Sequence, residues 1–347
     1  MQSANTILIG RDHTLGETLD CIAKHLLDQG KRVIRLPDLK AGEHSQIPLA
    51  EADRYLLDTT IIVVSSRTRI DDRVLAAAPN LKAVIFPSIG YNSCDVEAAA
   101  NRGIRVVNGV TPENYEGMAE ATAMLMAALM LELGPKQDWL RQGRTTPASL
   151  SSRMLKGRVV GMIGFGRIAQ ETIKRLQGWG IAKFLLHTRT APTNLDSRIS
   201  LCTLEELLRE SDIVSIHCPL NDHTKRLIGR NEFRLMKETS FLINTSRGGI
   251  IDENALYEAL RDKTIAAAAI DTFADEPLCF ESPLRSLKNI ILTQHNIGHT
   301  RDLFDSLVPR ALANIDEIIA GRNPKDTVNS ELLKDGLGKR QGQIALG

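Results

Sequence analysis

Two histidines, His295 and His299, stand four positions apart in the segment LTQHNIGHT, which covers residues 292–300. On a helix such a pair shares one face and could chelate a metal ion. The segment follows an apolar run typical of a strand and contains a glycine, so helical geometry is not expected, and no third ligand stands nearby. We therefore expect no metal site, which leaves proton transfer by one histidine as the alternative.

Three polar residues, Arg247, Glu276 and His295, each follow an apolar run of the chain. Open α/β sheets bind ligands beyond the carboxyl ends of their strands, where these residues are predicted to lie. A guanidinium can bind a carboxylate and polarise the neighbouring carbonyl, and an imidazole can deliver a proton as hydride arrives from a cofactor. A nearby carboxylate favours the charged imidazole and orients it. The three residues therefore predict reduction of a 2-keto acid.

A candidate cofactor motif lies in KGRVVGMIGFGRIAQETIKRLQGWG, residues 156–180, where G-x-G-x-x-A separates a predicted strand from an amphipathic helix. That context matters, because the glycine pattern alone is a weak signal. Gly164 would allow a tight turn, Gly166 would let a pyrophosphate approach the backbone, and Ala169 would permit close helix–strand packing. The phosphates would meet the positive end of the helix. The motif predicts a dinucleotide-binding site.

The next strand decides between NAD(H) and NADP(H). An NAD-specific site usually places Asp or Glu about 20 residues after the glycines, where the carboxylate holds the ribose 2′-hydroxyl. Here the strand ends in LLHTRTAPTN, with His187 at the expected acidic position and Arg189 close behind it. A carboxylate would repel a 2′-phosphate, whereas an arginine can bind it with two hydrogen bonds. We expect NADP(H) to be favoured; NAD(H) remains the alternative if Arg189 is only a surface residue.

The elements that must position these residues are short apolar strands alternating with helical stretches. In the first part of the chain, strands are predicted at residues 6–10, 32–36, 60–66, 81–86 and 104–109. After an apolar helical segment, further strands are predicted at residues 158–164, 182–188, 212–218, 240–246, 265–273 and 289–295. This alternation predicts two separate parallel sheets with helices on both faces. A last helix, at about 302–320, would have to pack back on one of them.

Bulk properties narrow the classes of function. A chain of 347 residues is expected to form two domains, and 43 basic against 42 acidic residues give no indication of a nucleic-acid partner. The five cysteines are scattered without a CxxC pair, which is typical of free thiols in a reducing compartment. The most apolar segment, 117–134, is interrupted by two glutamates and is too short for a membrane span. With no secretory signal in the sequence, we expect a cytoplasmic protein.

Several motifs, in order, resemble the D-isomer-specific 2-hydroxyacid dehydrogenases, and the resemblance runs from about Leu81 to Thr300. The stretch SIGYNSCDVEAAANRGIRVVNG is similar to the substrate loop of that family, and the segment from SDIVSIHCPL to GGIIDENAL is similar to its longest signature. DTFADEP and TQHNIGHT match the segments that hold its catalytic acid and histidine. Several independent motifs in the family's order are far more specific than any single one.

The resemblance implies a role for each candidate residue. Arg247 would bind substrate, Glu276 would pair with the histidine, and His295 would be the acid and base. The substrate carboxylate would also be held by backbone amides around Ser88, Ile89 and Gly90. Asp271 would hold the nicotinamide carboxamide. The remaining candidate cofactor contacts are Gly164, Gly166, Arg167, Ile168, His187, Thr188, Arg189, Cys218, Pro219, Thr245 and Ser246.

The resemblance also implies a fold and an assembly. We expect two Rossmann-like, doubly wound α/β domains, with the cofactor domain inserted in the substrate domain. The substrate domain would comprise residues 1–110 plus 300–330, the cofactor domain 111–299, and a tail without assigned function 331–347. Members of the family usually dimerise through the cofactor domain, so the apolar helix at 117–133 would be an interface element of a homodimer.

The sequence departs from the family pattern at several positions. Gln294 replaces the proline that usually precedes the histidine, Ser88 stands where glycine is frequent, and His299 lies near where a small residue or an aromatic is common. A further departure, His187 in place of an acid, points with Arg189 to the NADPH-using glyoxylate/hydroxypyruvate reductases as the nearest branch. His217 and His223 are interpreted as structural or solvent-facing residues.

Other functions are compatible with these motifs, and each would show a different property. A dinucleotide-sensing binding or co-regulator protein of this fold would bind cofactor with little turnover. An NAD-dependent D-2-hydroxyacid dehydrogenase would accept a larger substrate. A formate dehydrogenase is less favoured, because an amide side chain would be expected in place of Glu276. A long phosphoglycerate dehydrogenase is less favoured too, since no regulatory domain is expected after Asn329.

Overall fold

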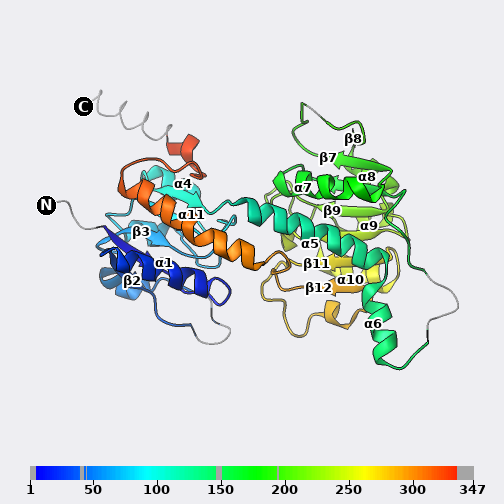
Figure 1. Ribbon diagram of the computed structural model, residues 1–347, viewed down its shortest axis with the longest axis horizontal. Helices are drawn as coiled ribbons and strands as arrows, with labels where there is room; N and C mark the ends of the chain where they lie inside the picture. Colours follow the sequence, from blue (N-terminus) through cyan, green and yellow to red (C-terminus); the bar gives the residue numbers. More distant parts are fainter. Residues whose placement is uncertain (1–4, 40–42, 44, 146–150, 194, 334–347) are drawn as a thin grey trace. The chain divides into compact units, whose positions relative to one another are not determined.

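A computed structural model (Figure 1) describes residues 5–333 except 40–42, 44, 146–150 and 194. Residues 334–347, most of the predicted tail, lie outside the described residues. The chain divides into two compact units, the first formed by Met1–Asn114 with Thr300–Gly347 and the second by Tyr115–His299. Each unit contains one parallel sheet with helices on both faces, so the predicted fold class, two doubly wound α/β domains, is confirmed.

The first unit contains a five-stranded sheet in the order β2-β1-β3-β4-β5. Its strands are β1 (Thr6–Ile9), β2 (Arg32–Arg35), β3 (Thr59–Val63), β4 (Ala83–Phe86) and β5 (Arg105–Asn108). Its helices are α1 (Gly16–Asp28), α2 (Ala52–Tyr55), α3 (Asp72–Ala76), α4 (Val96–Asn101) and α11 (Arg301–Ile319). The five strands predicted in this part of the chain are confirmed.

Residues along β1 show why its apolar run is unbroken. Ile7 and Ile9 lie in a core cluster with α1 and α11, whereas Leu8 points into the cluster on the opposite face of the sheet. Successive side chains of a strand point to opposite faces, and here both faces are covered. The expectation that the last helix packs back on a sheet is confirmed, because Leu307 and Ile315 of α11 belong to the same cluster as Ile7.

The second unit contains a seven-stranded sheet in the order β12-β11-β10-β9-β6-β7-β8. Its strands are β6 (Val159–Ile163), β7 (Lys183–His187), β8 (Ile199–Leu201), β9 (Ile213–Ile216), β10 (Phe241–Asn244), β11 (Ala267–Ile270) and β12 (Ile290–Leu292). Six of these strands were predicted. The seventh, β8, was missed because it is a short edge strand paired only with β7 and carries no apolar run.

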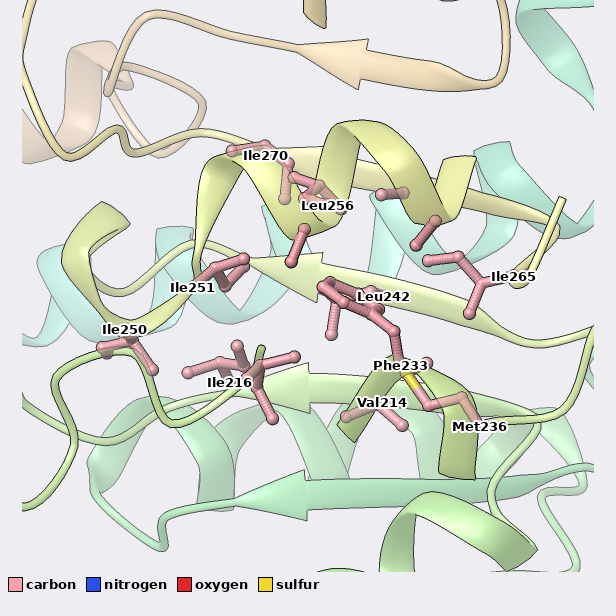
Figure 2. Close-up of a cluster of buried hydrophobic side chains, with 14 of the residues drawn as sticks. Val214, Ile216, Phe233, Met236, Leu242, Ile250, Ile251, Leu256, Ile265 and Ile270 are labelled. Atoms are coloured by element: carbon pink, nitrogen blue, oxygen red, sulfur yellow. The ribbon is translucent and has the colours of Figure 1, made fainter. Parts of the chain in front are cut away.

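Helices cover both faces of this second sheet. They are α5 (Pro112–Met130), α6 (Leu133–Arg141), α7 (Arg167–Leu176), α8 (Leu204–Glu210), α9 (Arg230–Leu235) and α10 (Glu253–Arg261). Figure 2 shows one face, where Phe233 of α9 and Leu256 of α10 pack with Leu242 of β10. On the other face, Met126 of α5 and Ile173 of α7 share a core cluster.

The apolar helix expected at 117–133 is α5, which begins earlier, at Pro112, and is followed after a break by α6. α5 ends at Met130, and Glu132 takes a left-handed conformation, with φ of 53°, before α6 begins. A non-glycine residue in that conformation interrupts helical geometry. Among the described residues, no single helix is long and apolar enough to cross a membrane, although α5 and α6, bent by 58° at the break between them, pass that test as a pair by length and composition.

Candidate active site

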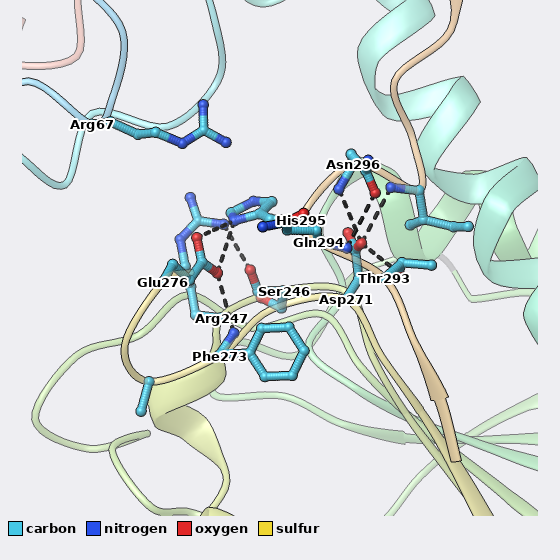
Figure 3. Close-up of polar contacts among 12 residues, drawn as sticks. Arg67, Ser246, Arg247, Asp271, Phe273, Glu276, Thr293, Gln294, His295 and Asn296 are labelled. Atoms are coloured by element: carbon cyan, nitrogen blue, oxygen red, sulfur yellow. Dashed lines mark hydrogen bonds and ion pairs between the residues drawn. The ribbon is translucent and has the colours of Figure 1, made fainter. Parts of the chain in front are cut away.

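A histidine and a glutamate meet beyond the ends of β11 and β12 (Figure 3). The Nδ1 atom of His295 lies 2.8 Å from Oε2 and 3.0 Å from Oε1 of Glu276, and the two side chains are 36% and 32% exposed. The backbone amide of Phe273 donates to Oε1 of the same carboxylate at 3.1 Å. Because Nδ1–H donates to Glu276, the other ring nitrogen, Nε2, is the atom that can give or take a proton.

The loop that carries His295 is organised by Asp271, which is 1% exposed. Oδ1 of Asp271 accepts from the Thr293 hydroxyl at 2.6 Å and from the amides of Asn296 and Ile297 at 3.0 and 3.2 Å. Its backbone carbonyl accepts from the His295 amide at 2.7 Å. These bonds hold His295 in a left-handed conformation, φ 50°, which costs a residue with a side chain about 1–2 kcal/mol. Sequence reasoning missed this role for Asp271.

Two other residues of this loop explain its unusual sequence. The backbone amide of Gln294 donates to the Asn296 side chain at 3.2 Å, a bond that the family's usual proline could not make because it has no N–H. A Cβ on Gly298 would lie 2.0 Å from the sulfur of Met118 in α5, so a larger residue at 298 would require the Met118 side chain to move. The substitution at 294 is therefore matched by a local hydrogen bond.

His299 lies in a turn, where its amide donates to the carbonyl of Asn296 at 3.0 Å, and α11 begins only at Arg301. His295 and His299 therefore do not share a helical face. Across the described part of the chain, no group of three or more histidine, cysteine, aspartate or glutamate residues is arranged to hold a metal ion.

Arg247 follows β10, and its guanidinium donates to the carbonyl of Ser246 at 2.7 Å. Burial lowers the pKa of Arg247, and the charge of nearby Glu276 raises it; arginine keeps its positive charge at neutral pH despite such shifts. The next residue, Gly248, lies against the loop that carries Glu276, since a Cβ there would fall 1.9 Å from the carbonyl carbon of Phe273. The structure thus brings together the predicted arginine, acid and histidine (Figure 3).

The glycine motif forms the turn between β6 and α7. Gly164 has φ of 97°, and a Cβ there would lie 2.8 Å from the amide nitrogen of Cys218. Gly166 caps α7, and a Cβ on it would meet no atom within 4 Å. Ala169, one turn along, is fully buried against the sheet. Open space before the amides of Arg167 and Ile168 at a helix start fits the phosphates of a dinucleotide.

At the end of β7, the predicted ribose position carries no carboxylate. His187 is half-buried, with Nδ1 3.3 Å from the carbonyl of Cys202, and the Thr188 hydroxyl donates to the carbonyl of Thr190 at 3.4 Å. Arg189 is exposed. The guanidinium of Arg167 lies 5.8 Å from the ring centre of Tyr115 at the start of α5.

The residues predicted to line the nicotinamide follow β9 and β10, the strands next to β6 and β11. The hydroxyl of Ser246 donates to the carbonyl of Cys218, which joins the two strand ends. The Thr245 hydroxyl lies 3.3 Å from that of Thr122 in α5. Pro219 is exposed, and burial raises the pKa of the Cys218 thiol. Next to them, His217 hydrogen-bonds Ser215 at 2.9 Å, and burial lowers its pKa to about 4.

The loop of Ser88, Ile89 and Gly90 belongs to the first unit and follows β4. The Asn108 side chain donates to the carbonyl of Ile89 at 3.2 Å, and the amide of Gly109 donates to that of Ser88 at 2.8 Å. A Cβ on Gly109 would lie 2.9 Å from the Ser88 amide nitrogen, so the end of β5 packs closely on this loop. The contact of the backbone amides of Ser88, Ile89 and Gly90 with a substrate carboxylate remains a prediction.

A dinucleotide turn after β6, together with arginine, acid and histidine at neighbouring strand ends, defines a nicotinamide-dependent oxidoreductase. Residues 123–296 match the family model of the D-isomer specific 2-hydroxyacid dehydrogenase, NAD binding domain. The chain belongs to this family, which confirms the resemblance seen in its motifs.

Similar proteins agree with that membership. The chain is 37% identical over 276 residues to a glyoxylate reductase from Aeropyrum pernix, covering 77% of this chain and 82% of the relative. It is 34% identical over 290 residues to a glyoxylate reductase from Thermococcus litoralis, covering 80% and 85%. The crystal structure of the TT0316 protein from Thermus thermophilus superposes with a TM-score of 0.81 at 31% identity, covering 93% of this chain and 99% of that one.

Proposed function

We propose that this protein reduces a small 2-keto acid of the glyoxylate or hydroxypyruvate type to the corresponding D-2-hydroxy acid, with NADPH as reductant. The observation that carries the proposal is the pairing of His295 with Glu276 beside Arg247. Reduction of a carbonyl next to a carboxylate requires a proton donor for the carbonyl oxygen and a fixed positive charge for the carboxylate. His295 and Arg247 can supply these two groups. The glyoxylate reductases among its relatives support the choice of substrate.

Each residue has a defined task in the proposed reaction. When bound, the reduced nicotinamide supplies the hydride that the keto carbon receives. Arg247 binds the substrate carboxylate and polarises the carbonyl. His295 donates the proton on Nε2 to the developing alkoxide oxygen, and Glu276 stabilises the imidazolium before transfer and orients the ring. In the oxidation direction, His295 accepts the same proton.

The preference for NADPH rests on the end of β7. His187 occupies the position where a carboxylate would repel a 2′-phosphate, and the exposed guanidinium of Arg189 is available to bind one. Gly166 and the first amides of α7 would hold the pyrophosphate. Asp271 would take the nicotinamide carboxamide through Oδ2, because the three bonds that organise the His295 loop all go to Oδ1.

The proposed assembly is a homodimer formed through the second unit. Three exposed apolar side chains, Leu131 (50%), Met154 (66%) and Trp179 (45%), line a hollow of about 230 Å³ beside the end of α5. Exposed apolar patches of this kind are typical of protein–protein contacts. A second copy of the chain would bury these side chains.

A panel of 2-keto acids tests the proposal. Glyoxylate, hydroxypyruvate and larger 2-keto acids are each assayed with NADPH and with NADH. We expect kcat/KM to be highest for glyoxylate or hydroxypyruvate with NADPH, and the product to be the D isomer. Tight binding of NADPH without turnover of any keto acid would contradict the proposal and favour a dinucleotide sensor. Higher kcat/KM with NADH would contradict only the choice of cofactor.

A further inference from the structure

We propose that Glu253, a residue outside the set of catalytic groups, is a positioning residue for Glu276. It holds the loop that carries Glu276 at the distance from which that carboxylate reaches His295. The inference rests on the proposed function, since it assigns Glu253 a part in the same proton transfer.

The contact that carries the proposal joins α10 to the loop after β11. Oε1 of Glu253 accepts a hydrogen bond from the backbone amide of Ala274 at 2.6 Å. Glu253 is the first residue of α10, but it does not cap the helix. The N-cap, Asp252, accepts from the amides of Asn254 and Ala255 at 3.1 and 3.2 Å. The carboxylate of Glu253 therefore serves the neighbouring loop and not its own helix.

A second contact holds the same loop from the same segment of chain. Phe273, the residue before Ala274, lies against Gly248, where a Cβ would fall 1.9 Å from its carbonyl carbon. The amide of Phe273 in turn donates to Oε1 of Glu276 at 3.1 Å (Figure 3). Two consecutive residues, Phe273 and Ala274, are thus fixed by the segment that runs from Arg247 into α10.

The consequence concerns the geometry of proton transfer. A carboxylate bond to a backbone amide is charge-assisted and stronger than a neutral one. Small displacements of a catalytic group can cost large factors in rate. Without the Glu253 bond, Ala274 loses a direct restraint, and the Glu276 carboxylate, two residues further on, is held less firmly toward His295.

Three variants separate positioning from a general effect on folding. We expect Glu253→Ala to lower kcat about tenfold, because a tenfold change in rate corresponds to the free energy of about one hydrogen bond. The Kd for NADPH and the KM for the keto acid should change less than about twofold. Glu253→Gln keeps an oxygen acceptor for Ala274 and should recover most of kcat. Asn254→Ala, at an exposed neighbouring position, is the matched control and should leave kcat unchanged. Equal losses in the alanine and glutamine variants would overturn the hydrogen-bond role.

A double-mutant cycle with Glu276→Gln tests whether Glu253 acts through Glu276. If it does, Glu253→Ala should cost about tenfold in the wild-type background and less than about threefold in the Glu276→Gln background. The same loss in both backgrounds would overturn the proposal, because an independent effect of Glu253 is additive.

Hydrogen exchange keeps this test distinct from that of the proposed function. Deuterium uptake by a peptide that spans residues 271–278 should rise in Glu253→Ala and stay near the wild-type rate in Glu253→Gln and Asn254→Ala. Unchanged uptake in the alanine variant would overturn the anchor even if the enzyme is active. If the wild-type protein reduces no keto acid, the proposed function fails, and the exchange result still decides whether Glu253 holds the loop.

Discussion

Both carboxylate oxygens of Glu276 lie within 3.0 Å of one ring nitrogen of His295, at 2.8 and 3.0 Å. A carboxylate that faces Nδ1 fixes the tautomer and the plane of the ring at once. The His295 backbone is fixed as well, by Asp271 and in a conformation unfavourable for a residue with a side chain. The imidazole is therefore held from its ring and from its main chain, which suits a group that must transfer a proton in a set direction.

Loss of the imidazole should abolish most of the chemistry without affecting cofactor binding. We expect His295→Ala to lower kcat by about two to four orders of magnitude, the usual contribution of a general acid. The Kd for NADPH, measured by fluorescence titration, should stay within about threefold of the wild-type value. His299→Ala is the matched control, because His299 lies in the following turn; it should keep near-normal kcat. Near-normal activity of His295→Ala would show that another group transfers the proton.

Replacement of Glu276 by glutamine should lower the rate of reduction. Glutamine keeps the shape of the side chain but removes the charge, and it offers one acceptor oxygen to Nδ1–H of His295 where the carboxylate offers two. We expect Glu276→Gln to lower kcat about tenfold or more, because the imidazole is oriented less firmly, and to leave the Kd for NADPH within about threefold of the wild-type value. An unchanged kcat would show that the carboxylate has no part in holding the ring.

Cofactor preference should follow the side chains at the end of β7. We expect Arg189→Ala to lower kcat/KM for NADPH about tenfold and to leave the value for NADH unchanged, because the lost hydrogen bonds reach only a 2′-phosphate. His187→Asp should shift the preference toward NADH, since it restores an acceptor for the ribose hydroxyl. Arg209→Ala on α8 removes one equal charge elsewhere and serves as control. Parallel loss with both cofactors in Arg189→Ala would contradict the assignment.

The lowered pKa of His217 predicts a loss of stability in mild acid. Burial lowers its pKa to about 4 from an ordinary 6.5. Between these two values the unfolded chain binds a proton at this residue and the native protein does not, so the free energy of unfolding falls as pH falls through that window. His217→Gln, which does not titrate, should lose less Tm than wild type when pH is lowered from about 7 to about 5. Equal slopes would show that other groups govern the change.

If the exposed apolar side chains of the second unit form the dimer interface, a charged substitution among them should weaken the dimer. We expect the wild-type chain to sediment at twice the mass of one chain, and Trp179→Asp to sediment as a monomer or as a weaker dimer. Burying a carboxylate in an apolar contact without a partner costs several kcal/mol. Leu27→Asp, at an exposed position on α1 of the first unit, is the control and should leave the dimer intact. A dimer of unchanged affinity in Trp179→Asp would place the interface elsewhere.

The features predicted from the sequence are those that depend on local pattern. Buried parallel strands need apolar side chains on both faces, so their runs stand out, and residues that follow them lie at one edge of the sheet. That is why Arg247, Glu276 and His295 could be grouped from the amino-acid sequence alone. Edge strand β8 lacks such a run, and the break at Glu132 depends on a single backbone angle.

Positioning contacts were not predicted, because they join residues without a local pattern. Asp271 holds a loop more than twenty residues away, and Glu253 bonds an amide 21 positions along the chain. Hydrophobic periodicity does not predict contacts between residues so far apart in the sequence. Each residue also has a simpler interpretation: Asp271 as a cofactor contact, and Glu253 as a first-turn residue of a helix. Gln294 was recognised as a departure, but its compensation by Asn296 is a feature of backbone geometry.

The place of α11 in the first core has a consequence for how the chain is made. Ile7 and Ile9 share their core with Leu307 and Ile315 of α11, which are synthesised only after the whole of the second unit. Until α11 leaves the ribosome, one apolar face of the first sheet lacks its cover, whereas the second unit, contained within 115–299, is already complete in sequence. A released chain truncated after residue 299 should therefore protect the second unit from protease better than the first, because one apolar face of the first sheet stays uncovered.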